Sequence, residues 1–116
     1  MRVLVKKPGQ EPEIMELGSL VDINKIVGNL DENGNGLREP SSDIRMTIGP
    51  KIDEYCKADA LINFDMEPNI WNHNNMGVLH GTVIFTGIDV DDHFNPCSLT
   101  DDQIAFCLDY INRQSI

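Results

Sequence analysis

A lone tryptophan set among amide side chains is the part of the sequence best suited to recognising a ligand or partner. Trp71 is the only tryptophan of the chain. An aromatic ring offers a rigid stacking surface, and amides offer paired hydrogen-bond donors and acceptors, as a nucleotide base or a polar hot spot requires. The alternative is that Trp71 closes the core while the asparagines cap turns. The candidate binding residues of this segment are Asn69, Trp71, Asn72, His73 and Asn75.

Acidic residues form a second candidate binding surface, because Asp89, Asp91 and Asp92 follow the longest strand that the sequence predicts. The formal net charge is −10, and beyond Lys57 the only lysine or arginine is Arg113. Direct binding to nucleic acid is disfavoured, because phosphates demand a basic face. The acidity serves either solubility or the encounter with a partner protein that has a basic surface.

Metal sites are expected neither in the asparagine-rich loop nor among the histidines. Asp31–Gly36 matches the start of a calcium loop, but the last ligand position holds Ser42 in place of a bidentate carboxylate, so we expect a turn. His73, His80 and His93 could join the three aspartates to hold zinc, iron or manganese, yet no two histidines have ligand spacing. We therefore predict no metal and no cofactor.

The side chains that could act as nucleophiles lack the neighbours that catalysis needs. Cys56, Cys97 and Cys107 form no C-x-x-C pair, which indicates reduced thiols. Cys107 falls on the apolar stripe of a predicted helix, and Cys97 has no basic neighbour to lower its pKa. No Ser-His-Asp order, phosphate loop or G-x-G-x-x-G motif is present. We predict no catalytic residue and no enzyme, with a metal-dependent enzyme as the least favoured alternative.

The elements that must position these residues predict an α+β fold. We expect a small, mostly antiparallel sheet with an N-terminal hairpin, one internal helix and a C-terminal capping helix. Residues 29–43 are rich in Asn, Gly, Pro and Ser and predict a flexible loop. Pro68 is expected to end a strand because it cannot donate to a ladder. The expected elements are strands at 2–6, 12–17, 44–48, 59–65 and 79–88, helices at 20–28 and from Thr100 onward, and a helical turn at 51–57.

The C-terminal helix has the clearest local signature. Thr100 and Gln103 are spaced as a capping box, and Leu99 and Ile104 are spaced as its hydrophobic staple. In the longest predicted strand, the glycines near the two ends, Gly81 and Gly87, predict a bulge or a close approach of backbones. The residues predicted to form the core stripe of the helix are Ile104, Cys107, Leu108 and Ile111.

The length of 116 residues is typical of a single domain, and we expect one α+β domain over residues 1–116. The sequence has no run of about eighteen apolar residues, and its first residues are too short an apolar segment for a signal peptide. We therefore expect a cytoplasmic protein that does not bind membranes.

Four short motifs carry a resemblance to a known family: Met1–Val5 with Pro8–Gly9, Pro68–Asn69, Gly81–Gly87 and Ser98–Ile104. The chain resembles the domain-of-unknown-function family 3846 (DUF3846), which is found mostly on phages, plasmids and other mobile elements of Gram-positive bacteria. The family often has Pro-Asn-Arg where this chain has Pro68, Asn69 and Ile70, so any role of that arginine is absent here. The resemblance covers most of the chain except about 31–57.

The resemblance implies an accessory protein of a mobile element and implies no chemistry. The first hypothesis is an anti-defence inhibitor that binds or sequesters a host protein through acidic loops. The second is a sponge that sequesters a small nucleotide signal near Trp71; its phosphates would need basic residues, which a homo-oligomer would supply as Arg2, Lys6 or Lys7 of another subunit. The third is the metal-dependent enzyme.

Overall fold

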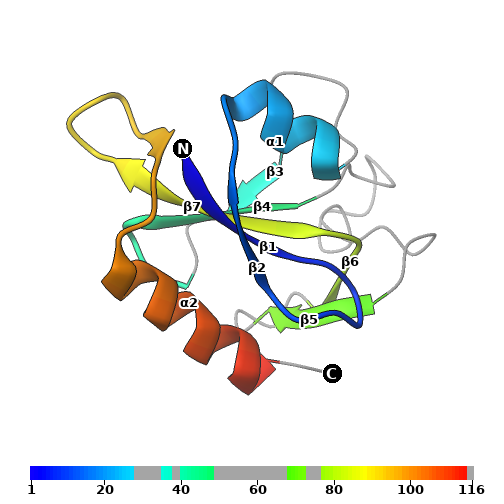
Figure 1. Cartoon of the computed structure of the whole chain (residues 1–116). Coiled ribbons are helices and arrows are strands. Elements are labelled where there is room, and N and C mark those ends of the chain that lie inside the picture. Colours follow the sequence, from blue (N-terminus) through cyan, green and yellow to red (C-terminus); the bar gives the residue numbers. More distant parts are fainter. Residues whose placement is uncertain (28–34, 38–39, 49–67, 73–76, 115–116) are drawn as a thin grey trace.

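An antiparallel sheet of six strands forms the centre of the structure (Figure 1). The computed structural model describes residues 1–27, 35–37, 40–48, 68–72 and 77–114. Five strands follow the order β2-β1-β7-β4-β3, and β8 also pairs with β7. The expected α+β fold and its N-terminal hairpin are confirmed. The strands of this sheet are β1 (Arg2–Lys6), β2 (Glu13–Glu16), β3 (Asn35–Leu37), β4 (Ile44–Ile48), β7 (Val83–Asp89) and β8 (Asn95–Cys97).

Among the described residues, two helices and a separate hairpin surround this sheet. The hairpin consists of β5 (Pro68–Asn72) and β6 (Gly77–His80), which form a two-stranded sheet of their own within the described part of the chain. Figure 1 shows α1 (Leu20–Val27) on one side of the sheet, and α2 (Asp101–Gln114) with the β5–β6 hairpin on the other. Neither helix in the described part of the chain has the length and apolar character needed to cross a membrane.

The strand β7 is central because it has neighbours along both of its edges. Phe85 pairs with β1 and with β4, which places those two strands on opposite edges. Gly87 pairs with β4 and with β8, so β8 must share the edge of β1. Six consecutive residues of β7, from Val83 to Ile88, are buried, as the apolar residues on both of its faces predicted.

Each face of the sheet carries its own apolar cluster. On the α2 side, Ile44, Met46 and Ile48 alternate along β4 and are at most 1% exposed, which confirms the predicted period of two. Tyr110 of α2 joins this cluster through an edge-to-face contact with Phe85, with ring centroids 6.3 Å apart. The apolar cluster on the α1 side is smaller. Its buried members are Val3, Val5, Ile23, Val27 and Ile84, and Met1, Met15 and Leu17 pack against them.

The start of α2 is capped as its sequence predicts. The Thr100 amide donates to Gln103 Oε1 at 2.9 Å, and the Gln103 amide donates to Thr100 Oγ1 at 3.1 Å. Leu99 and Ile104 are both buried in the same cluster, so the staple is formed as well. The Gln103 amide group also donates to the backbone oxygen of Asp43 at 3.1 Å. The cap therefore joins α2 to the residue that precedes β4.

Three expectations about the strands are wrong. The segment 79–88 does not form one strand, because Gly81, with φ of 81°, separates β6 from β7; only glycine adopts this conformation without strain. The segment that starts at Pro68, which we expected to lie outside any element, begins with the strand β5; proline is tolerated at the first position of a strand, where its missing N–H costs no ladder bond. The short strands β3 and β8 form where we expected loops.

Other expectations fall outside the described residues and stay predictions. The strand at 59–65, the helical turn at 51–57 and most of the Asp31–Gly36 loop belong to this group. The close approach predicted at Gly87 is confirmed, because a Cβ atom at this position would lie 2.9 Å from Cys97 Sγ.

Candidate functional site: the acidic hairpin tip

The turn between β7 and β8 presents acidic and apolar side chains together at the surface. We call residues 89–94 the hairpin tip. Asp89, Asp91 and Asp92, which the sequence singled out, are all exposed in it. Between and beside them, Val90 is 57% exposed and Phe94 is 54% exposed. Figure 1 shows this hairpin, coloured yellow to orange, projecting away from both helices. The tip is therefore available to a partner.

Local hydrogen bonds hold the hairpin tip in one conformation. The Asp91 amide donates to Asp89 Oδ1 at 3.0 Å, and the Asp92 amide donates to the Asp89 backbone oxygen at 3.2 Å. The Asn95 amide then donates to the Asp92 backbone oxygen at 3.0 Å, where β8 begins. The carboxylate of Asp89 therefore has a structural role in this turn.

Two consecutive residues of the tip have a left-handed backbone although neither is glycine. His93 has φ of 53° and Phe94 has φ of 60°. This conformation costs roughly 1–2 kcal/mol for each residue with a Cβ atom. Strain of this kind persists only where the surrounding structure imposes it, and it is concentrated at functional sites. Here it directs the aromatic residue Phe94 to the surface beside the aspartates.

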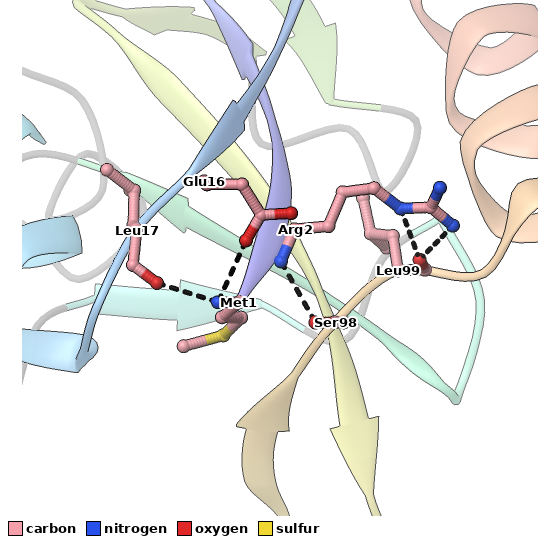
Figure 2. Close-up of polar contacts among 6 residues, drawn as sticks. All are labelled: Met1, Arg2, Glu16, Leu17, Ser98 and Leu99. Carbon is pink, nitrogen blue, oxygen red and sulfur yellow. Dashed lines mark hydrogen bonds and ion pairs between the residues drawn. The ribbon is translucent and has the colours of Figure 1, made fainter.

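The base of the hairpin is fixed by contacts with the first residues of the chain (Figure 2). The Arg2 amide donates to Ser98 Oγ at 2.9 Å, and the Leu99 amide donates to the Arg2 backbone oxygen at 2.9 Å. The Arg2 side chain donates twice to the Leu99 oxygen, at 2.9 and 2.7 Å, and lies 3.0 Å from Asp101 Oδ1. The chain leaving β8 is therefore tied to β1 and to the start of α2.

The amino group of Met1 extends this set of contacts to β2. It donates to the Leu17 backbone oxygen at 2.8 Å and to Glu16 Oε2 at 3.2 Å, as Figure 2 shows. The Leu17 amide donates back to the Met1 oxygen at 2.9 Å. The strands β2, β1 and β8 are thus linked at the end of the sheet from which the hairpin emerges.

The thiol at the base of the hairpin is not activated as a nucleophile. Partial burial raises the pKa of Cys97, and the nearby charges of Asp89 and Asp43 raise it further. Burial raises the pKa of Cys107 to about 12, in the core position that the sequence predicted. Among the described residues, no group of three or more His, Cys, Asp or Glu side chains is placed to hold a metal ion.

The second predicted site is only partly described, and its described member lies inside the protein. Asn69 is 5% exposed; its amide group donates to the backbone oxygens of Lys6 and Gly81, both at 2.8 Å. It makes no contact with the hairpin tip. The backbone of Trp71 and Asn72 belongs to β5, in a segment expected to lie outside any element, while their side chains, and all of His73 and Asn75, lie outside the described residues. Nucleotide binding near Trp71 stays a prediction.

The sequence did not single out the apolar members of the hairpin tip. Val90 stands between aspartates and Phe94 follows His93, so neither belongs to a periodic stripe. A large apolar residue next to charged residues at the end of a buried strand is the signal that would have found them.

Comparison with known proteins places this chain in a family but gives no activity. A comparison with curated proteins and one with solved structures each found no match. A family model described as "Domain of unknown function (DUF3846)" matches residues 1–114. This range includes the segment near residues 31–57, where the motifs alone showed no likeness, and every described helix and strand. The chain therefore belongs to the DUF3846 family.

Proposed function

We propose that this protein is a non-catalytic binding protein whose hairpin tip docks on a partner protein with a basic surface. The resemblance to proteins of mobile elements supports a host factor as that partner, bound in the cytoplasm and inhibited or sequestered by the complex. The observation that carries the proposal is the combination found at the tip: exposed aspartates, exposed apolar side chains and a turn held in one conformation.

The two kinds of side chain contribute to different parts of binding. Exposed carboxylates in a protein with a net charge of −10 attract a basic surface and raise the association rate. Val90 and Phe94 supply apolar area that is removed from water in the complex, which slows dissociation. A turn that is already ordered loses little conformational entropy when it binds.

The charge variants that test this proposal must spare the turn itself. Asp89 is left unchanged because its carboxylate holds the Asp91 amide. The test variant carries Asp91→Asn and Asp92→Asn. The matched control carries Glu13→Gln and Asp102→Asn, which removes two charges from exposed positions on β2 and α2. Both proteins therefore have the same net charge and differ only in where it is lost.

The experiment is quantitative affinity capture from host lysate, followed by association kinetics with the purified partner. At low salt we expect the test variant to associate roughly tenfold more slowly than the wild type, with the difference shrinking as salt screens the charges. The control should associate at nearly the rate of the wild type, because its two lost charges lie away from the tip and change only the net charge. Equal capture of the same basic partner by the wild type and the test variant at low salt would remove the proposal.

A further inference from the structure

The strand β2 lies at an edge of the central sheet and has one unpaired side. It ends the strand order, and within the described part of the chain it pairs with β1 alone. Glu13, Ile14 and Glu16 are exposed, while Met15 is half-buried. Ile14 is 54% exposed, which is unusual for a large apolar residue within a strand. An open edge can be extended by a strand of another chain.

The pairing of β1 with β2 determines which backbone groups of β2 face the open edge. The Leu17 amide donates to the Met1 oxygen at 2.9 Å, and the Met1 amino group donates to the Leu17 oxygen at 2.8 Å. Bonded and non-bonded pairs alternate along an antiparallel ladder, so Met15 belongs to the next bonded pair. The N–H and C=O groups of Ile14 and Glu16 therefore point away from β1, and no described residue bonds to them.

The side chains of β2 form a symmetric pattern, with an acidic residue at each end and two apolar residues between them. Ile14 is paired with a residue of the α2-side cluster and lies on that face, whereas Met15 packs against the cluster on the other face. A strand beside β2 holds its side chains next to these residues. The complementary strand therefore has two central apolar residues, with a basic residue at each end beside Glu13 and Glu16.

The charges of β2 favour a different protein over a second copy of this chain. Two β2 strands side by side would bring two glutamates from each copy to one shared edge, and each chain has a net charge of −10. Like charges on adjacent strands destabilise their pairing, and opposite charges stabilise it. The glutamates thus protect the edge from self-association and are complementary to a basic segment.

We propose that β2 binds an extended segment of a partner protein, in which lysine or arginine flanks two apolar residues, as an added strand. Main-chain bonds to Ile14 and Glu16 supply affinity, and the side-chain pattern supplies selectivity. Binding also removes the exposed Ile14 side chain from water. This surface goes beyond the function proposed above and shares no residue with the hairpin tip.

The probe is a synthetic peptide of about ten residues with lysine, valine, valine and lysine at its centre. One control peptide has glutamate in place of each lysine. A second control keeps the sequence and the charge but carries N-methyl groups on the central backbone amides, so it cannot pair as a strand. In calorimetric titrations at low salt, we expect the wild type to bind the probe and to bind both controls roughly tenfold more weakly or less.

Two substitutions at one position separate the backbone of β2 from its side chain. Ile14→Pro removes the outward amide and leaves the bonds to β1, because this amide is not part of that ladder. Ile14→Ala is the matched control, since it keeps the amide. We expect Ile14→Pro to bind the probe roughly tenfold more weakly than Ile14→Ala does. The peptide comparison uses the wild type and is informative even if Ile14→Pro does not fold.

The protein with Asp91→Asn and Asp92→Asn distinguishes this surface from the hairpin tip. It should bind the probe as the wild type does, so the tip proposal and this inference can fail separately. Loss of probe binding in this protein would place the peptide at the tip and overturn the inference.

Hydrogen exchange of the wild type shows where the peptide binds. The probe should slow exchange of the Ile14 and Glu16 amides, while the Met15 amide, already bonded to β1, should change little. No binding of the probe, equal binding of either control peptide, or unchanged exchange at Ile14 and Glu16 would overturn the inference. A dimer of the free protein that Ile14→Pro dissociates would also overturn it, because the edge would then belong to a second copy.

Discussion

Asn69 and Lys6 hold the β5–β6 hairpin against the central sheet. Lys6 is 7% exposed, and its Nζ atom donates to Asn69 Oδ1 at 3.1 Å and to the Lys7 oxygen at 2.8 Å. Burial lowers the pKa of the Lys6 ammonium, while the charge of Glu11 raises it to a smaller extent. A buried ammonium is tolerated only with hydrogen-bond acceptors around it. Asn69 supplies one of these and also bonds two backbone oxygens.

Replacing Asn69 with alanine should therefore destabilise the fold. The substitution leaves the Lys6 ammonium and the backbone oxygens of Lys6 and Gly81 without this partner, and we expect a loss of about 2–4 kcal/mol in the free energy of unfolding. Urea denaturation measures it. Asn112→Ala, at an exposed position of α2, is the control and should change stability by about 0.5 kcal/mol or less. An equally small effect of Asn69→Ala would show that these bonds do not hold the hairpin.

At the scale of elements, the pairing of β8 with β7 depends on glycine at position 87, which has no Cβ atom. Gly87 lies opposite Cys97 in the register of the two strands. A Cβ atom at position 87 would lie 2.9 Å from Cys97 Sγ and 3.1 Å from the Ser98 backbone oxygen. Both distances are shorter than ordinary contacts between these atoms, so only glycine lets the strands approach. The position of the hairpin tip follows from this approach.

The substitution Gly87→Ala should thus loosen the hairpin. We expect it to lower the free energy of unfolding by about 1–3 kcal/mol through overpacking. Adding Cys97→Ala removes the sulfur atom and should restore part of the loss, while the clash with the Ser98 oxygen remains. Denaturation of both proteins, together with hydrogen exchange of the β8 amides, checks this. A Gly87→Ala protein as stable as the wild type would mean that the strands can separate at no cost.

Local signals predicted the parts of this fold in which a short sequence pattern decides the structure. The capping box at Thr100 and Gln103 formed because both partners lie within one helical turn. The alternation of Ile44, Met46 and Ile48 was sufficient to define β4. The break at Gly81 was missed because strand-forming residues lie on both sides of it, and only the pairing of β6 with β5 shows that β6 leaves the sheet. The strands β3 and β8 are three residues long and contain glycine or proline, so no apolar alternation indicates them.

The candidate site was also predictable only in part: the sequence indicated its acidic residues but not its apolar ones. The charges of Asp89, Asp91 and Asp92 could be seen in the sequence, and their exposure followed from the end of a strand. The accompanying Val90 and Phe94 were not predicted, because neither belongs to a periodic apolar stripe, and no glycine or asparagine at positions 93 and 94 indicates the left-handed backbone found there. The burial of Thr47 and Thr86 was likewise not predicted, since it results from the register of β4 against β7.

At the scale of the whole molecule, the two faces of the sheet and the hairpin are separate in structure. One face packs against α2 and the β5–β6 hairpin, and the other packs against α1. The hairpin tip lies at an end of β7, outside both clusters, and is joined to the sheet through Gly87 and the Arg2 contacts. Substitutions at the tip are therefore expected to change binding without changing the core.

The central claim is that the hairpin tip is the surface that meets a basic partner protein, and site-specific photo-crosslinking tests it most directly. A photoreactive amino acid replaces Val90, 57% exposed in the tip, or Phe106, 45% exposed on α2, in otherwise identical proteins. After irradiation in host lysate at low salt, we expect a covalent adduct with a basic protein from position 90 and not from position 106. The adduct should disappear when Asp91→Asn and Asp92→Asn are added. Equal adducts from both positions, or an adduct at position 90 that survives loss of both charges, would contradict the claim.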